Sequence, residues 1–242
     1  MSSLLDLAVV IPVYNEEGCI RTVLESWIRI LNNLKINFNI LVLNDGSVDG
    51  TSRVLAEFKS DLRFKIIEKA NSGHGPTILM GYKKAVSLAE WTFQCDGDDE
   101  IQADSFPLLW QQRFQFDAIF GSREARIQSL DRRFLSVASR WVVTGLFKSG
   151  VLDVNVPYRL IRSTVLKKLL EQIPENTFAP NVIISGAIAL SDLRIQNISV
   201  RHVVRRTGRV SLQGLRTIKA GLKVFMQTLH GRSSISVIKT ES

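Results

Sequence analysis

Two aspartates separated by one glycine, Asp96 and Asp98, have the spacing that most directly suggests chemistry. They follow an apolar, β-type run at residues 91–95, and side chains at positions i and i+2 leave a strand on the same side. Carboxylate oxygens suit hard divalent cations such as Mg²⁺ or Mn²⁺, which in turn bridge diphosphate groups. We therefore expect Asp96 and Asp98 to hold a cation that neutralises a departing nucleotide diphosphate.

The acidic segment has two other interpretations. An EF-hand calcium loop is excluded, because Ile101 stands where the loop needs glycine and Pro107 stands where it needs glutamate. A solvated acidic turn over residues 96–100 explains the same residues without a metal. This segment alone does not decide between a solvated turn and a cation site.

A second polar segment, residues 44–51, is rich in Asx residues and glycine. It suits the N-terminal cap of a helix, and Asp45 could also accept a hydrogen bond from a nucleobase N–H at a strand end. The sequence has neither a G-x-G-x-x-G motif nor a P-loop, which disfavours dinucleotide cofactors and Walker-type ATP cleavage. His74 lies between two glycines, and we interpret it as structural or solvated rather than catalytic.

The first half of the chain alternates apolar β-type runs with helical patterns. Strands are expected at residues 7–13, 38–43, 63–68 and 91–95, and helices at 17–33, 49–59 and 76–89. This alternation predicts an α/β fold with a mostly parallel sheet flanked by helices, with ligands at the carboxyl ends of the strands. The polar clusters YNEE, NDGSVDG, NSGHG and DGDDE fall at those ends, so we expect them to converge on one edge.

The second half is less regular. We expect strands or extended segments at residues 117–120, 153–161 and 195–204, and helices at 132–148, 182–190 and 212–229. The last helix has an apolar stripe flanked by Arg216, Lys219 and Lys223, which suits either a membrane interface or packing on the core. We predict one domain over residues 1–210 and a basic amphipathic C-terminal arm over 211–242.

Charge is distributed unevenly along the 242 residues, whose net charge is +8. Residues 1–121 carry 11 basic and 16 acidic side chains, whereas residues 122–242 carry 20 and 7. The first half therefore suits a cation-bridged ligand and the second half an anion.

Targeting signals are not evident. The start has no basic region, no apolar run reaches about 18 residues, and Cys19 and Cys95 lack CxxC spacing. We expect a cytoplasmic protein, peripherally associated with the cytosolic face of a membrane.

Four segments taken together, residues 9–17, 43–51, 71–82 and 94–100, resemble family 2 glycosyltransferases of the GT-A fold. The resemblance implies a nucleotide-sugar donor (a UDP- or GDP-sugar) and inversion at the anomeric carbon. It makes Asp96 and Asp98 the metal–diphosphate motif and places Gly73 in a loop that closes on the nucleoside. The residues that it places around the base and ribose are Pro12, Tyr14, Glu16 and Asp45.

The second half is similar to the dolichyl-phosphate mannose synthase branch, which makes polyprenyl-phosphate sugars, in residues 121–123, 132–136, 153–160 and 205–208. The resemblance implies a dolichyl or undecaprenyl phosphate acceptor and gives Arg159 a catalytic role beside the two aspartates. A loop closed by Arg205, or by Arg206, would cover the acceptor. The residues that would hold its phosphate are Arg123, Arg132, Ser136 and Arg159.

The chemistry of the acceptor supports a phosphate independently. A hydroxyl acceptor needs a general base, whereas a phosphate is already an oxyanion and needs only positive charge to hold it. Hydroxyl-transferring relatives usually carry a late pair of neighbouring carboxylates, and no such pair follows Glu124.

Two alternatives stay open beside this hypothesis. One is a family 2 enzyme with a hydroxyl acceptor in polysaccharide or glycolipid synthesis. The other is a non-catalytic basic module for membrane or nucleic acid, which is disfavoured because no nucleic-acid recognition signature appears. Residues 153–159 and 180–186 depart from the mannose synthases, so the sugar, the nucleotide and the lipid are not assigned.

Overall fold

The computed structural model describes residues 4–123, 150–154 and 156–203. The helices expected at residues 132–148 and 212–229 lie outside the described residues, as do Arg132, Ser136 and Arg205.

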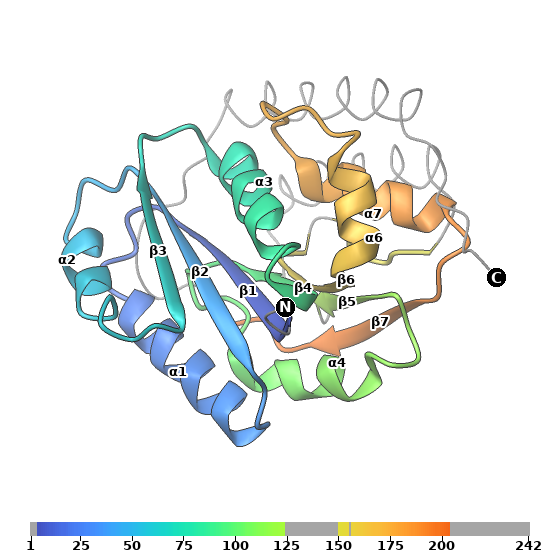
Figure 1. The fold of residues 1–242 in the computed structure, drawn as a ribbon, viewed down its shortest axis with the longest axis horizontal. Coiled ribbons are helices and arrows are strands. Elements are labelled where there is room, and N and C mark those ends of the chain that lie inside the picture. Colours follow the sequence, from blue (N-terminus) through green and yellow to red (C-terminus); the bar gives the residue numbers. More distant parts are fainter. Residues whose placement is uncertain (1–3, 124–149, 155, 204–242) are drawn as a thin grey trace.

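A sheet of seven strands forms the centre of the molecule, in the order β3-β2-β1-β4-β6-β5-β7 (Figure 1). All neighbours are parallel except that β6 runs antiparallel to both β4 and β5. The predicted mostly parallel α/β sheet is therefore confirmed. The strands are β1 (Leu5–Val13), β2 (Phe38–Asp45), β3 (Phe64–Lys69), β4 (Ala89–Cys95), β5 (Ala118–Arg123), β6 (Tyr158–Arg162) and β7 (Ile195–Val200).

Helices cover both faces of the sheet (Figure 1). On one face lie α1 (Ile20–Asn33), α2 (Thr51–Ala56) and α4 (Phe106–Gln112), with the 3₁₀ turn η1 (Ala103–Ser105) leading into α4. On the other face lie α3 (His74–Ala85), α6 (Ser163–Leu170) and α7 (Pro180–Leu190).

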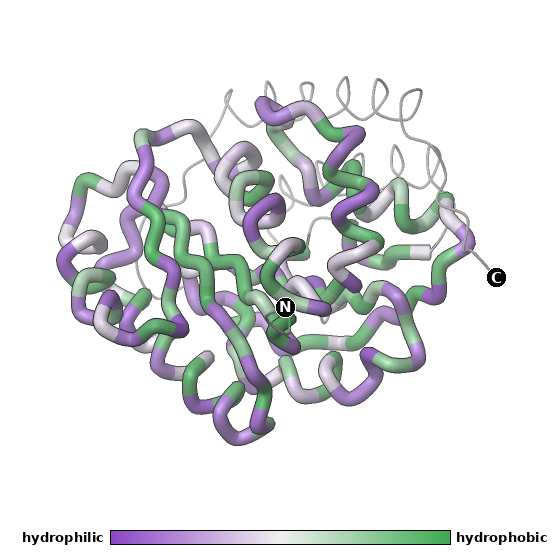
Figure 2. The backbone as a smooth tube through the Cα atoms, in the orientation of Figure 1, coloured by the Kyte–Doolittle hydropathy of each residue, from purple (hydrophilic) through white to green (hydrophobic). Residues whose placement is uncertain are grey.

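The apolar run of β1 explains this layering. Alternate residues of the strand enter different cores: Val9 packs with α1, and Val10 packs with α3. A strand buried on both faces needs a continuous apolar sequence, and Figure 2 shows hydrophobic residues concentrated in the central strands. Trp27 of α1 anchors one core, with its ring centroid 5.1 Å from that of Phe93 and 5.3 Å from that of Phe106.

The observed elements differ from the expected ones mainly at their ends. Helix α1 begins only at Ile20, because the preceding residues form a loop in which the carbonyl of Glu16 accepts the N–H of Cys19. Helix α3 begins earlier than expected, at His74, and ends at Ala85. The short helices α4 and α6 were not predicted, since one or two turns give little periodicity.

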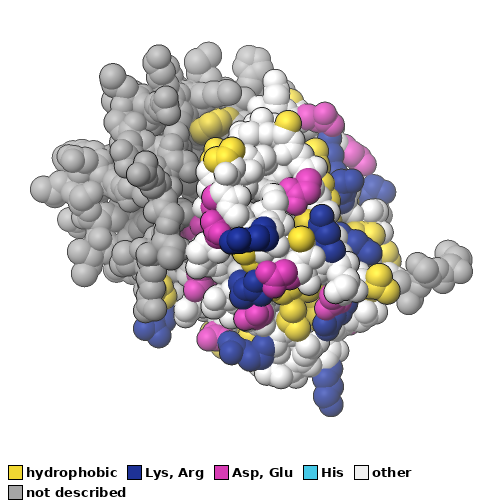
Figure 3. All heavy atoms as spheres, turned by 90° about the vertical axis from the view of Figure 1, so that its left-hand side faces the viewer, with side chains coloured by type: hydrophobic (Ala, Val, Ile, Leu, Met, Phe, Trp, Pro, Cys, Tyr) yellow, Lys and Arg dark blue, Asp and Glu magenta, His cyan; other side chains and the backbone are white. Residues whose placement is uncertain are grey.

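Charges of both signs are interspersed on the face that carries α2 and β3 (Figure 3). Ion pairs near the surface include the exposed pair of Arg53 with Glu17 and the partly buried pair of Arg63 with Asp61. Such pairs contribute little to stability. Most of the basic residues of the second half lie outside the described part of the chain, so this face does not test the predicted anion-binding half.

Asp117, just before β5, forms an ion pair that contributes more to stability than the pairs at the surface. Its carboxylate accepts hydrogen bonds from the Arg194 backbone N–H at 3.0 Å and from the Arg194 guanidinium at 3.0 and 3.2 Å. Burial alone would raise the pKa of Asp117, but these hydrogen bonds outweigh it and the net pKa is lowered. The ionised carboxylate therefore stabilises the connection between β5 and β7.

We expect Asp117→Asn to lower the free energy of unfolding by about 1 to 2 kcal/mol at pH 7, measured by urea denaturation. A carboxyl whose folded pKa is depressed stabilises the fold above its ordinary pKa, and this stability is lost as pH falls through the folded pKa. The difference between wild type and variant should therefore shrink below about pH 4. A difference that stays constant down to acid pH would contradict the role of the charge.

Candidate active site

The loops after β1 and β2 are joined at the carboxyl edge of the sheet. The backbone N–H of Asn15 donates to Ser47 Oγ at 2.9 Å, and that of Glu16 donates to Thr51 Oγ1 at 2.9 Å. In return, Val48 donates its N–H to Asn15 Oδ1 at 2.8 Å. The first two predicted polar clusters therefore do converge.

Three of the residues predicted around the base and ribose come from the carboxyl end of β1 and the loop that follows it. Pro12 is buried near the carboxyl end of β1, opposite Leu43 of β2, so it packs inside the protein beneath the loop that follows the strand. Tyr14 follows the strand and is 41% exposed, which leaves its ring accessible. Glu16 is buried, and its carboxylate accepts a hydrogen bond from the Cys19 thiol at 3.3 Å.

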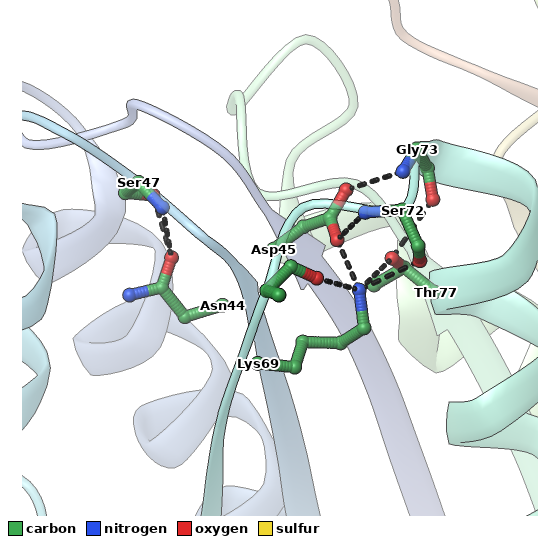
Figure 4. Close-up of polar contacts among 8 residues, drawn as sticks. Asn44, Asp45, Ser47, Lys69, Ser72, Gly73 and Thr77 are labelled. Carbon is green, nitrogen blue, oxygen red and sulfur yellow. Dashed lines mark hydrogen bonds and ion pairs between the residues drawn. The ribbon is translucent and has the colours of Figure 1, made fainter.

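Asp45 organises the loop after β3 (Figure 4). Its carboxylate accepts the backbone N–H groups of Ser72 and Gly73, each at 2.9 Å, and pairs with the Lys69 ammonium. Lys69 also donates to Ser72 Oγ at 2.7 Å and to Thr77 Oγ1 at 3.3 Å. Burial pushes the pKa of Asp45 up, yet the hydrogen bonds from Lys69 and Ser72 bring the net pKa below its usual value. Asp45 is therefore a firmly held carboxylate.

The loop after β3 leads directly into α3. Gly73 has a φ of 90°, a left-handed conformation that a side chain would strain, and it caps the helix. The next residue, His74, places Nε2 3.7 Å from Asp96 Oδ1. Sequence reasoning set His74 aside, although its place right after a strand-end loop was the available signal.

The two predicted metal ligands lie in the turn after β4. Asp96 Oδ1 accepts a hydrogen bond from Gln94 Nε2 at 3.0 Å, and Asp98 Oδ1 accepts the backbone N–H of Glu100 at 3.1 Å. Gly97 packs closely on β1, since a Cβ there would lie 3.1 Å from Val13 Cγ2. Burial raises the pKa of Asp96, while the nearby charges of His74 and Arg159 lower it only in part. A bound cation would offset this cost.

The chain that follows β7 also reaches this turn. His202 Nε2 lies 2.9 Å from Glu100 Oε2, and the Val203 N–H donates to the Glu100 carbonyl at 2.8 Å. The predicted Arg205 follows two residues later, outside the described residues. No local spacing pointed to this contact, because its two side chains are 102 positions apart.

Arg123, one of the predicted phosphate ligands, ends β5 and forms a bidentate pair with Asp153. Its Nε lies 2.7 Å from Asp153 Oδ2, and its Nη2 lies 3.2 Å from Asp153 Oδ1. The Arg123 side chain is 20% exposed, so part of it stays accessible to solvent.

Arg159 lies in β6, between β4 and β5 in the sheet, and has no exposed surface. Its guanidinium donates to the carbonyl of Asn181 at 3.0 Å, to that of Val156 at 2.5 and 3.2 Å, and to Ser185 Oγ at 3.2 Å. This placement leaves Arg159 no exposed donor for an acceptor phosphate. Its predicted roles in holding the phosphate and in catalysis stay predictions.

A mostly parallel sheet with carboxylates gathered where four strands end has the architecture of a GT-A domain. The chain belongs to glycosyltransferase family 2, since the model of the family described as Glycosyl transferase family 2 matches residues 8–176. The family resemblance expected from the four polar segments is confirmed.

Known proteins similar to this chain support the family and the fold. An undecaprenyl-phosphate 4-deoxy-4-formamido-L-arabinose transferase of Pectobacterium carotovorum is 26% identical over 217 residues, 88% of this chain, which spans 64% of that relative's length. Glucosyl-3-phosphoglycerate synthase from Mycobacterium tuberculosis, solved with Mn²⁺, UDP-glucose and phosphoglyceric acid, aligns with a TM-score of 0.68 and 14% identity over 96% of this chain and 81% of its own. TarS residues 1–349 from S. aureus align with a TM-score of 0.59 and 16% identity over 93% and 72%. At these identities the solved structures establish the fold alone.

Within the described ranges, no helix is both long and apolar enough to cross a bilayer.

Proposed function

We propose that the chain is an inverting glycosyltransferase that moves a hexose from a nucleotide-sugar donor to a polyprenyl phosphate. The observation that carries the proposal is the meeting of four strand-end loops, which holds Asp45 and Asp96 at one edge of the sheet. The similarity to undecaprenyl-phosphate transferases over 88% of this chain supports the acceptor class.

The donor's nucleoside would lie between the loops after β1, β2 and β3. The accessible ring of Tyr14 offers a surface for stacking, and Asp45 offers carboxylate oxygens to a base N–H. Pro12 and Glu16 shape the floor of this site, and Gly73 lets the loop above it turn tightly. UDP and GDP both remain candidates for the nucleotide.

The residues present fit a hard divalent cation, Mg²⁺ or Mn²⁺, beside the diphosphate. Asp96 and Asp98 supply carboxylate oxygens, the ligand type that such cations prefer. Among the described residues, no group of three or more side chains of the metal-ligating types is found. When bound, the cation would neutralise the charge that develops on the departing diphosphate.

The transfer itself needs little proton chemistry. A phosphate oxygen of the acceptor forms a bond to the anomeric carbon as the bond from that carbon to the diphosphate oxygen breaks, and the electron pair leaves with the nucleoside diphosphate. The acceptor oxygen is already ionised, so no general base is required. Positive charge would orient the acceptor, and Arg123 is the candidate among the described residues. Arg132, Ser136 and Arg205 keep their predicted acceptor roles.

The acceptor is tested by a transfer assay on the full chain. Radiolabelled UDP- and GDP-sugars would be mixed with Mn²⁺ or Mg²⁺ and a polyprenyl phosphate, and label extracted into organic solvent would be counted. We expect acid-labile lipid label from one donor, abolished by EDTA. The matched control is the corresponding polyprenol, which lacks the phosphate and should accept no sugar.

Transfer to the polyprenol or to a glycan hydroxyl, with none to the polyprenyl phosphate, would contradict the proposed acceptor and favour the hydroxyl-acceptor alternative. A lipid acceptor also places the reaction at a membrane surface, and we infer a peripheral position on the cytosolic face. Co-sedimentation of the chain with anionic vesicles checks this position.

A further inference from the structure

Asp96 is the end of a buried chain of side chains that continues into the second half of the protein. Gln94 Nε2 donates to Asp96 Oδ1 at 3.0 Å, and Asn181 Nδ2 donates to Gln94 Oε1 at 3.1 Å. The hydroxyl of Tyr82 then donates to Asn181 Oδ1 at 3.1 Å. The three links join β4, α7 and α3, which lie far apart in the sequence.

The direction of every hydrogen bond in this series of side chains is fixed by the Asp96 carboxylate at its end. A carboxylate only accepts hydrogen bonds, so Gln94 must present its NH₂ group to Asp96 and its carbonyl oxygen to Asn181. The same requirement turns the Asn181 oxygen towards Tyr82. Every donor therefore points along the chain towards Asp96, an arrangement in which each hydrogen bond polarises the next.

Burying these polar side chains costs free energy unless each of them is hydrogen-bonded. Gln94 has no exposed surface, Tyr82 is 1% exposed and Asn181 is 5% exposed. Buried polar groups of this kind persist when all of them are paired. Arg159 adds to the arrangement from β6, since it donates to the backbone carbonyl of Asn181 and to Ser185 Oγ and so fixes the first turn of α7.

We propose that Gln94, Asn181 and Tyr82 are positioning residues that hold the Asp96 carboxylate in the orientation a divalent cation needs. The inference rests on the proposed function, which makes Asp96 a metal ligand. It adds that helix α7, from the second half of the chain, helps to set the metal affinity of a site in the first half. Residues that orient a metal ligand in this way usually change metal affinity about 10- to 100-fold when removed.

The test measures Mn²⁺ binding by the full chain rather than turnover. Free Mn²⁺ would be followed by electron paramagnetic resonance during titration, with and without UDP. We expect Gln94→Leu to weaken Mn²⁺ binding about tenfold. Asn181→Leu should have a smaller effect and Tyr82→Phe the smallest, because each lies one link further from Asp96.

Thr92→Val is the matched control. Thr92 also lies in β4, two positions before Gln94, and is equally buried, but its hydroxyl is hydrogen-bonded to Ser163 Oγ at 2.8 Å instead of belonging to the chain. The control loses a buried hydrogen bond as Gln94→Leu does. A general loosening of the fold would therefore weaken Mn²⁺ binding in both variants, whereas the inferred role affects only Gln94→Leu.

Wild-type Mn²⁺ affinity in Gln94→Leu would overturn the inference, and so would an equal loss in Thr92→Val. Since Gln94→Leu could fail to fold, Tyr82→Phe, which removes a single oxygen, provides a second measurement: a loss larger than that of Asn181→Leu would also overturn it. Wild-type protein that binds no Mn²⁺ would overturn the proposed metal site, and the inference with it.

Discussion

Replacing Asp96 with Asn is expected to reduce sugar transfer about a thousandfold, the effect of losing roughly 4 kcal/mol of charge stabilisation at the departing diphosphate. The amide oxygen of the new residue still accepts the hydrogen bond from Gln94, so the turn after β4 is retained. What is lost is the negative charge that would hold the cation. The measurement is kcat/KM for lipid-extractable label, with Mn²⁺ or Mg²⁺ saturating.

The same substitution should not lower stability. The pKa of Asp96 is raised by burial, which means that its ionised form is less favourable in the folded protein than in the unfolded chain. A neutral Asn removes that cost, so we expect an unchanged or slightly higher melting temperature.

The matched control for the loss of transfer is Asp104→Asn, at an exposed carboxylate in η1 that lies 3.8 Å from Arg29. Asp104→Asn should keep transfer within about twofold, as expected for an exposed ion pair. More than a tenth of wild-type transfer in Asp96→Asn would exclude the assigned role.

The parallel half of the fold was predictable from local sequence. Continuous apolar runs such as that of β1 indicate strands buried on both faces, and helical patterns between them leave only a parallel arrangement. Once the strands are parallel, the residues that follow them must share an edge. The convergence of Asp45, Gly73 and Asp96 therefore followed from chain order alone, with no knowledge of their contacts.

Contacts between segments that are distant in the sequence could not be predicted from the sequence. Asn181 bonds to Gln94 across 87 positions, and His202 bonds to Glu100 across 102. Neither pair has a spacing that a motif could reveal, because the partners become neighbours only through the order β4-β6-β5-β7 in the sheet. Residue type was no guide either, since amide side chains such as those of Gln94 and Asn181 usually lie at the surface.

Arg159 was assigned to the acceptor phosphate from the family resemblance, which carries no information on burial. Residues 153–161 were expected to form an extended segment, and the resemblance to the polyprenyl-phosphate branch alone gave Arg159 a place at the acceptor phosphate. In the sheet, however, β6 lies between β4 and β5, with α6 and α7 covering the face that Arg159 shares with Ile161. A polar side chain on a central strand must then find its partners inside the protein.

Arg159→Ala is accordingly expected to destabilise the fold, by about 3 to 5 kcal/mol of unfolding free energy. Truncation leaves the carbonyls of Val156 and Asn181 buried without their donor and opens a cavity against Phe120, whose ring centroid lies 5.6 Å from the guanidinium carbon. For a chain of this size the melting temperature should fall by roughly 10 °C. Thermal unfolding followed by circular dichroism measures the change.

Arg21→Ala is the matched control for this loss, because Arg21 forms an exposed ion pair with Glu57. An exposed pair of this kind contributes little to stability, so its removal should move the melting temperature only slightly. Melting temperature and KM together then distinguish two hypotheses for Arg159, acceptor binding and internal hydrogen bonding. If Arg159→Ala melts like wild type and shows only a raised KM for the polyprenyl phosphate, the guanidinium binds the acceptor after all. If it melts well below Arg21→Ala, the buried hydrogen bonds to β6 and α7 are what the arginine supplies.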